Sequence, residues 1–224
     1  MSQIECVFFD CDGTLVDTEV LCCQAYVNVF ATYNVSLALE QFIAEFKGVR
    51  LHDIILRTCE RYHLTQETAV LEQEYRDEIA RLFDAALQPI PGVRELLETL
   101  QVPTAVVSNG PVSKMQRTLG KTALLPFFGD RLYSGYDIQT WKPDPAILYY
   151  AADQMKVAIE RCILVEDSEA GVQAGISAGI PVFYYCADTL NRPIHHPLVT
   201  QFDDMRALPA LWRERGWAQL TRDR

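Results

Sequence analysis

The stretch that decides the fold is IECVFFDCDGT, residues 4–14. Its first six residues form a short run rich in Val, Ile and Phe, which predicts a buried strand. Asp10 and Asp12 follow directly, and Gly13 supplies the backbone freedom for a turn. Side chains two residues apart on an extended segment point to the same side, so both carboxylates are expected to face one crevice. Such a pair needs a cation or a proton when buried, although the pattern alone also fits a solvated turn.

Beyond this stretch the chain alternates strand-like and helix-like segments. Residues 104–107, 163–165 and 182–185 are short apolar runs that predict strands, and a helix is expected over residues 168–178. Alternation of this kind predicts a parallel sheet that is covered by helices on both faces. The predicted fold class is therefore α/β.

Residues 17–87 differ from the rest of the chain. Apolar residues recur there at helical spacing, strand-like runs are absent, and the pattern predicts about four helices. The run PIPG, residues 89–92, then marks a boundary. We therefore expect an α/β core formed by residues 1–16 and 88–224, interrupted by a helical domain over residues 17–87.

Composition restricts the class of protein. Hydrophobic residues make up 49% of the chain, which is enough apolar material to bury a core. No apolar run approaches the roughly 18 residues that a membrane span needs, and the N-terminus has no signal-like segment. The formal net charge of −10 disfavours nucleic acid and anionic membranes as partners. Seven cysteines without a CxxC pair indicate reduced thiols and, with the missing signal segment, a cytoplasmic protein. Separately, we expect the protein to be a monomer.

Further polar residues follow the other predicted strands. Ser108 and Asn109 come after the second strand of the chain, and Glu166 and Asp167 come after the third. Lys142 lies between these two clusters in the sequence. In an open parallel sheet, ligands bind outside the carboxyl ends of the strands, so these residues are expected to converge with the two aspartates on one pocket.

The chemistry of these side chains points to phosphate. Carboxylate oxygens suit Mg²⁺, whereas an ammonium, a hydroxyl and backbone N–H groups suit a phosphoryl group. A carboxylate held beside a phosphate is a competent nucleophile that forms an aspartyl-phosphate, which water then cleaves. Asp144 is expected to cap a helix whose first residue is Pro145, and this arrangement would fix the direction of Lys142.

Residues 9–17, FDCDGTLVD, resemble the first motif of the haloacid dehalogenase superfamily phosphohydrolases. Ser108 is similar to the second motif of that family, Lys142 to the third and Glu166-Asp167 to the fourth, in the expected order. The resemblance covers essentially the whole chain, because the family carries a helical cap after the first motif. It implies a Rossmann-like parallel-sheet core with an inserted α-helical cap, and a Mg²⁺-dependent phosphatase.

The resemblance also implies a role for each acidic residue. Asp10 is similar to the nucleophile and would also bind Mg²⁺ through its carboxylate. Asp12 resembles the general acid and base, and its backbone carbonyl would bind the metal. Asp167 resembles a direct metal ligand, and Glu166 a ligand that binds either directly or through water.

The remaining candidate residues would bind the substrate. By the same resemblance, Ser108 and Lys142 would hold the transferring phosphoryl group, with Asn109 assisting from the same loop. Lys47 and Arg50 lie between two predicted cap helices, where a lid could present cations to a remote anionic group of the substrate. A solvated loop is the alternative for these two residues.

The substrate is expected to be a small phosphorylated metabolite, with 6-phosphogluconate or a related sugar phosphate preferred by resemblance. The alternative is a phosphosugar mutase of the β-phosphoglucomutase type. Mutases carry a histidine where this chain has Cys22 and an arginine one position away from Arg50, so both departures disfavour the alternative. A receiver-type signalling domain also phosphorylates an aspartate, but it needs no helical insert of this size.

Overall fold

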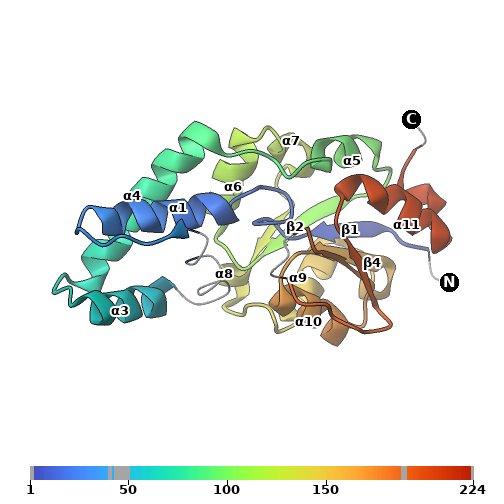
Figure 1. Cartoon of the computed structure of the whole chain (residues 1–224). Helices are drawn as coiled ribbons and strands as arrows, with labels where there is room; N and C mark the ends of the chain where they lie inside the picture. Colours follow the sequence, from blue (N-terminus) through green and yellow to red (C-terminus); the bar gives the residue numbers. More distant parts are fainter. Residues whose placement is uncertain (1–2, 40–41, 43–50, 188–190, 223–224) are drawn as a thin grey trace. The chain divides into compact units, whose positions relative to one another are not determined.

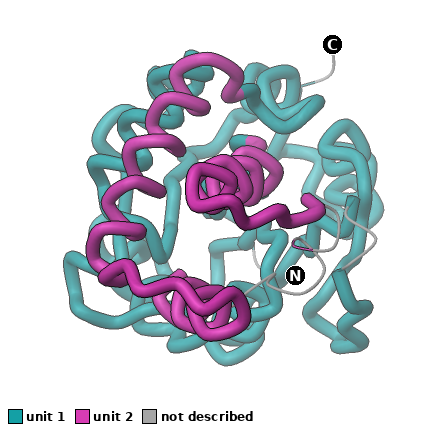
Figure 2. Tube along the Cα trace, turned by 60° about the vertical axis from the view of Figure 1, so that its left-hand side comes forward, with its two compact units in different colours: residues 1–16, 88–224 teal, residues 17–87 magenta. Residues whose placement is uncertain are grey.

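The computed structural model describes residues 3–39, 42, 51–187 and 191–222. The chain divides into two compact units, which Figure 2 shows in different colours. Unit 1 contains residues 1–16 and 88–224, and unit 2 contains residues 17–87. Each unit has a hydrophobic core of its own.

Unit 1 is built on a six-stranded parallel sheet. In chain order the strands are β1 (Cys6–Phe9), β2 (Thr104–Ser108), β3 (Leu132–Ser134), β4 (Cys162–Glu166), β5 (Val182–Tyr185) and β6 (Val199–Phe202). Their spatial order is β3-β2-β1-β4-β5-β6, and every neighbouring pair runs parallel. The sheet grows in one direction from β1 to β3 and in the other from β4 to β6, so the topological switch point lies between β1 and β4. The predicted α/β class with a Rossmann-like sheet is confirmed.

Four of these strands were expected from apolar runs, and two were not. All residues of β1, β2, β4 and β5 are buried except Tyr185, which is why their sequences are almost continuously apolar. The unpredicted strands β3 and β6 lie at the two edges of the sheet. β3 has only three residues, and β6 contains the partly or fully exposed residues Thr200 and Gln201. Such short or polar edge strands lack the apolar run on which the prediction depends.

The helices described in unit 1 are α5 (Val93–Thr99), α6 (Val112–Lys121), α7 (Leu125–Phe128), α8 (Gly135–Ile138), α9 (Ala146–Met155), α10 (Glu169–Ala178) and α11 (Leu208–Glu214). Short 3-10 segments occur at Ile159–Arg161, Met205–Ala207 and Ala218–Leu220. The helix expected after the third predicted strand is α10, and the Ser168 hydroxyl caps it by accepting a hydrogen bond from the N–H of Gly171 at 3.1 Å. Asp144 accepts a hydrogen bond from the N–H of Ala146 at 2.8 Å, but the N-cap residue is Pro145 and not Asp144 as predicted. α9 begins at Ala146, so Pro145 precedes the first helical residue instead of occupying that position.

Helices cover both faces of the sheet. Successive side chains of each strand point to opposite faces, so each face presents apolar side chains against which helices pack. On one face Phe8 packs into the core that the strands share with α9 and α10. On the other face the ring of Phe9 contacts that of Phe128 in α7, with the ring centroids 6.1 Å apart. Figure 1 shows α9 and α10 on one side of the strands and α5, α6 and α7 on the other.

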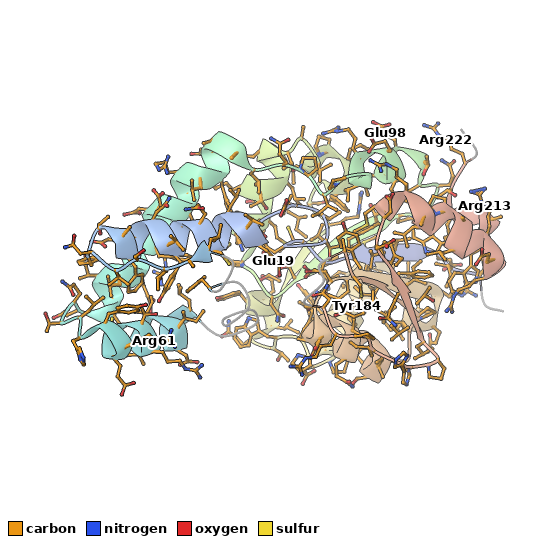
Figure 3. All side chains as sticks on the ribbon, in the orientation of Figure 1. Glu19, Arg61, Glu98, Tyr184, Arg213 and Arg222 are labelled. Atoms are coloured by element: carbon orange, nitrogen blue, oxygen red, sulfur yellow. The ribbon has the colours of Figure 1, made fainter. Side chains whose placement is uncertain are left out.

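The C-terminal segment is anchored to α5. The backbone N–H of Arg222 donates to the carbonyl of Thr99 at 2.9 Å, and its guanidinium donates to the carbonyl of Glu98 at 3.0 Å. Glu98 and Arg222 lie next to each other in Figure 3, at the same end of unit 1 as Arg213 of α11. Because α5 leads into the amino end of β2, these contacts lie away from the carboxyl ends of the strands.

The helices described in unit 2 are α1 (Glu19–Ala31), α3 (Leu51–Tyr62) and α4 (Thr68–Ala86). Their core forms around Tyr26, whose ring stacks on Phe30 at 4.4 Å and on Phe42 at 4.3 Å between centroids. The Tyr26 hydroxyl donates to the hydroxyl of Thr58 at 2.8 Å, so the polar group of this buried ring is satisfied. The helical character that the apolar spacing predicts is therefore present in the described part of this unit.

Two general expectations can be compared with the described ranges. None of their helices is both long and apolar enough to cross a membrane. All seven cysteines are free thiols, as the sequence indicated. The thiol of Cys11 lies 3.8 Å from the hydroxyl of Thr118 in α6, so it is turned toward a helix that covers the sheet.

Candidate active site

Three carboxylates meet at the switch point between β1 and β4. Asp10 follows β1, Glu166 ends β4, and Asp167 comes next in the chain. The N–H of Asp10 donates to the carbonyl of Val165 at 2.9 Å, which extends the pairing of the two strands as far as the site. One oxygen from each carboxylate lies within 4.8 Å of the other two, and all three residues are buried. Carboxylate oxygens at this spacing could hold a hard divalent cation.

Lys142 balances part of the negative charge of this cluster. Its ammonium lies 2.7 Å from Oδ1 of Asp10 and 2.7 Å from Oε2 of Glu166, and its side chain is only 2% exposed. Burial alone would lower the pKa of Lys142, but the attraction of the two carboxylates raises it above its usual range. Burial and the neighbouring Glu166 carboxylate raise the pKa of Asp10 to about 7, although Lys142 opposes that rise. The cluster thus carries more negative charge than one lysine balances.

The raised pKa of Asp10 predicts how the stability of the metal-free protein depends on pH. From about pH 4, where aspartate titrates in unfolded chains, up to about pH 7, the folded state binds more protons at Asp10 than the unfolded state does. The free energy of unfolding therefore falls as the pH rises through this range. Asp10→Asn removes this contribution, so in chelator its melting temperature should exceed that of the native protein by at least about 3 °C at pH 8.

The same comparison at pH 5 is the control. At pH 5 the unfolded chain has lost the Asp10 proton and the folded protein still holds it, so part of the effect is already present; the difference in melting temperature should be smaller than at pH 8 by at least about 3 °C. Other titrating groups are common to both proteins and cancel in the difference. A difference that stays constant between pH 5 and pH 8 would contradict the assignment.

The Glu166 side chain is held from two sides. Its Oε1 accepts hydrogen bonds from the N–H of Asp167 at 3.1 Å and from the N–H and hydroxyl of Ser168 at 3.0 and 2.9 Å. Its Oε2 accepts the bond from Lys142. A Cβ added to Gly171 in α10 would lie 1.8 Å from Oε2 of Glu166, so the carboxylate occupies space that only a glycine leaves. In the sequence, this contact is indicated only by Gly171 itself, a glycine near the start of a predicted helix.

Asp167 is oriented by the turn that follows β1. The hydroxyl of Thr14 donates to Oδ1 of Asp167 at 2.7 Å. Gly13 has a φ of +85°, and a Cβ added there would lie 2.2 Å from Oδ2 of Asp167. The turn glycine expected from the sequence is therefore needed for two reasons, the left-handed backbone and the close approach of a carboxylate.

Ser108 and Asn109 lie at the carboxyl end of β2. The Ser108 hydroxyl is buried and accepts a hydrogen bond from the N–H of Gly110 at 3.0 Å. The Asn109 amide binds the backbone of Lys142 twice, accepting from its N–H at 2.8 Å and donating to its carbonyl at 3.1 Å. Asn109 therefore holds the backbone of Lys142 in place. The sequence analysis expected Asn109 to assist in binding the phosphoryl group.

Asp12 brings in a residue that the sequence did not identify. Oδ2 of Asp12 lies 2.8 Å from the ammonium of Lys114 in the first turn of α6, and its Oδ1 is buried with no hydrogen-bond partner among the described residues. The charge of Asp12 also raises the pKa of Asp10, although less than burial and Glu166 do. A lysine on an amphipathic helix usually belongs to the solvated face, so Lys114 carries no signal of its own in the sequence.

The predicted cap residues Lys47 and Arg50 lie outside the described residues. Their neighbour His52, on α3, is described. Its Nδ1 lies 2.8 Å from Oε1 of Glu72 in α4, so it joins two helices of unit 2.

The features of this site together define a class of hydrolase. They are a parallel sheet, two aspartates after β1, a buried lysine and a carboxylate pair at the end of β4. The chain belongs to the haloacid dehalogenase-like hydrolase family, whose model matches residues 7–185. A HAD family hydrolase from Deinococcus radiodurans R1, solved with bound phosphate and sodium, has the same fold with a TM-score of 0.80 and 23% identity, and the match covers 100% of both chains.

Two relatives are more similar in sequence. The chain is 52% identical over 217 residues to the 6-phosphogluconate phosphatase of Escherichia coli (strain K12). This match covers 97% of this chain and 98% of that protein. It is 30% identical over 191 residues to the phosphorylated carbohydrates phosphatase of Thermotoga maritima. This match covers 84% of this chain and 88% of that protein. The predicted superfamily and the predicted enzyme class, a phosphoric monoester hydrolase, are confirmed by the family match and the first of these relatives.

Proposed function

We propose that the protein is a Mg²⁺-dependent phosphatase that hydrolyses 6-phosphogluconate, or a related sugar phosphate, through an aspartyl-phosphate. The observation that carries the proposal is the buried cluster of Asp10, Glu166 and Asp167, joined by Lys142, at the switch point of the sheet. Identity of 52% to a 6-phosphogluconate phosphatase over nearly the whole chain supports the substrate.

The acidic cluster has the donor atoms that Mg²⁺ prefers. Asp10 and Asp167 would each offer a carboxylate oxygen, and Asp12 its backbone carbonyl. Both oxygens of Glu166 already accept hydrogen bonds, from Lys142 on one side and from Ser168 on the other, which favours binding through water. When bound, Mg²⁺ would neutralise charge on the phosphoryl oxygens.

In the first half of the reaction, the Asp10 carboxylate attacks phosphorus and the bond to the leaving oxygen breaks. Asp12 donates a proton to that oxygen, so the alcohol leaves uncharged. The ammonium of Lys142, fixed 2.7 Å from Oδ1 of Asp10, offsets negative charge as the phosphoryl group transfers. The hydroxyl of Ser108 would bind a phosphoryl oxygen, and Asn109 keeps Lys142 in position through its backbone.

In the second half, water cleaves the aspartyl-phosphate. Asp12, now ionised, takes a proton from the water as its oxygen attacks phosphorus. The bond between phosphorus and Asp10 breaks, which regenerates the carboxylate and releases inorganic phosphate. Asp12 thereby regains the proton that it donated in the first half.

Residues 17–87 are proposed to act as a cap for the catalytic core formed by residues 1–16 and 88–224, with Lys47 and Arg50 binding the part of the substrate remote from phosphate. Arg50→Ala should then raise KM about tenfold or more and change kcat less than threefold, since it removes binding shared by substrate and transition state. Arg57→Ala, at an exposed position of α3, is the matched control and should leave both constants unchanged. If KM and kcat of Arg50→Ala equal the native values, Arg50 does not bind the substrate.

The proposed activity can be tested by measuring phosphate release from a panel of phosphorylated metabolites, with Mg²⁺ and with chelator. The panel contains 6-phosphogluconate, phosphoglycolate, β-glucose 1-phosphate and several sugar phosphates. We expect chelator-sensitive release that is fastest from 6-phosphogluconate. Faster release from another compound would overturn the substrate and keep the reaction. Isomerisation of β-glucose 1-phosphate without phosphate release would instead establish a mutase.

The proposed partner is the small-molecule substrate alone. A formal net charge of −10 opposes binding to nucleic acid and to anionic membranes, and the enzyme is proposed to act as a cytoplasmic monomer. Light scattering of the purified protein at several concentrations measures the oligomeric state directly.

A further inference from the structure

The two lysines of the site differ in how far they are exposed to solvent. Lys142 is 2% exposed and contacts two buried carboxylates. Lys114 is 36% exposed and pairs with the 28% exposed side chain of Asp12. An ion pair as exposed as the second contributes little to stability, so its lysine can exchange Asp12 for another anion at low cost.

Lys114 lies on the side of the site where the leaving group must sit. A Cβ added to Gly110 would lie 3.5 Å from Oγ of Ser108, 3.7 Å from Oδ2 of Asp12 and 3.7 Å from Cδ of Lys114, so the three side chains surround one point. In the proposed reaction Ser108 binds the phosphoryl group and Asp12 meets the leaving oxygen. A substrate bound in this way places the next atoms of its leaving group beside Lys114.

The charges at this position favour an acidic leaving group. Four carboxylates line the site, and the buried lysine is occupied by two of them. A substrate that carries a carboxylate in addition to phosphate would meet repulsion from the acidic cluster of the site unless a further cation were present. Lys114 supplies that cation on a flexible four-carbon stem, which lets the ammonium follow a carboxylate along the leaving group.

We propose that Lys114 is a specificity-determining residue that exchanges Asp12 for a carboxylate of the substrate. The exchange frees the Asp12 carboxylate to meet the leaving oxygen and makes the enzyme prefer phosphorylated sugar acids to neutral sugar phosphates of the same length. This inference rests on the proposed phosphatase function and names the substrate class of the same site.

The test compares 6-phosphogluconate with sorbitol 6-phosphate, which differs from it only in having a hydroxymethyl group in place of the carboxylate. The native enzyme should have the higher kcat/KM for the acid. In Lys114→Gln the ratio of kcat/KM for the acid to that for the neutral substrate should fall at least tenfold. Lys114→Arg, which keeps the positive charge, should hold the ratio within about threefold of the native value.

Lys121→Gln is the matched control, because Lys121 lies seven residues further along α6 at an exposed position. It should leave the ratio unchanged. Melting temperatures of all variants check that each one is folded, which is expected because both lysines are at least partly exposed.

The possible failures are distinguishable. An equal loss for both substrates in Lys114→Gln would mean that Lys114 acts only through Asp12, and it would overturn the inference while keeping the phosphatase. An unchanged ratio, or a native preference for sorbitol 6-phosphate, would overturn it in the same way. The absence of chelator-sensitive phosphate release from every compound in the panel would overturn the proposed function, and the inference with it.

Discussion

Asp10→Asn is expected to lower kcat by about 10⁵-fold or more, because the amide cannot form the aspartyl-phosphate and cannot ligate Mg²⁺ as a carboxylate does. The change is nearly isosteric, and the metal-free variant should be folded and at least as stable as the native protein at neutral pH. Steady-state phosphate release from 6-phosphogluconate at saturating Mg²⁺ measures the effect. Rapid quenching should find a phosphorylated protein for the native enzyme and none for the variant.

Asp130→Asn is a matched control for the loss of one carboxylate. Asp130 is exposed and precedes β3, away from the carboxyl ends of the strands, so kcat should stay within about twofold of the native value. A residual activity of Asp10→Asn within 100-fold of native, in a preparation free of native protein, would exclude Asp10 as the nucleophile. It would leave the acidic cluster as a metal site alone.

Gly171→Ala should have the second-largest effect, although it adds one methyl group outside the reacting atoms. The added Cβ would lie 1.8 Å from Oε2 and 2.0 Å from Cδ of Glu166, so the carboxylate must move. Its displacement breaks the contact with Lys142 and disturbs the proposed metal site. We expect kcat/KM to fall at least about 100-fold, the Mg²⁺ concentration for half-maximal activity to rise, and the free energy of unfolding to fall by about 1–3 kcal/mol.

Gly120→Ala in α6 is the control for the substitution itself. A Cβ added to Gly120 has no neighbour within 4 Å, so alanine should raise the free energy of unfolding by up to about 1 kcal/mol through its helix propensity. Mg²⁺ titrations and denaturant unfolding of both variants measure the contrast. Native Mg²⁺ dependence in a stable Gly171→Ala would contradict the role of this close approach.

The interior of the sheet could be predicted because its strands are buried on both faces. β1, β2, β4 and β5 read as apolar runs, and the polar residues that end them identify the carboxyl edge of the sheet. The edge strands β3 and β6 escaped prediction for the opposite reason, since they are short or partly exposed. The sequence pattern thus follows burial more closely than it follows secondary structure.

The candidate site divides in a similar way. The sequence alone determined the family, the order of its motifs and the chemical types of the main residues, because these depend on local spacing and on which side chains follow a strand. Only the tertiary structure decided the partner of each side chain. Asn109 binds the backbone of Lys142, 33 residues away, and Lys114 pairs with Asp12, 102 residues away.

The physical reason is that a polar side chain takes its partner from whatever the fold brings within hydrogen-bonding distance. Thr14 and Asp167 are 153 residues apart in the chain and 2.7 Å apart in the structure, since β1 and β4 are neighbours at the switch point. The local sequence shows that Thr14 follows one strand and that Asp167 follows another strand. The order of the strands in the sheet, which depends on how the whole core packs, determines that the two residues meet.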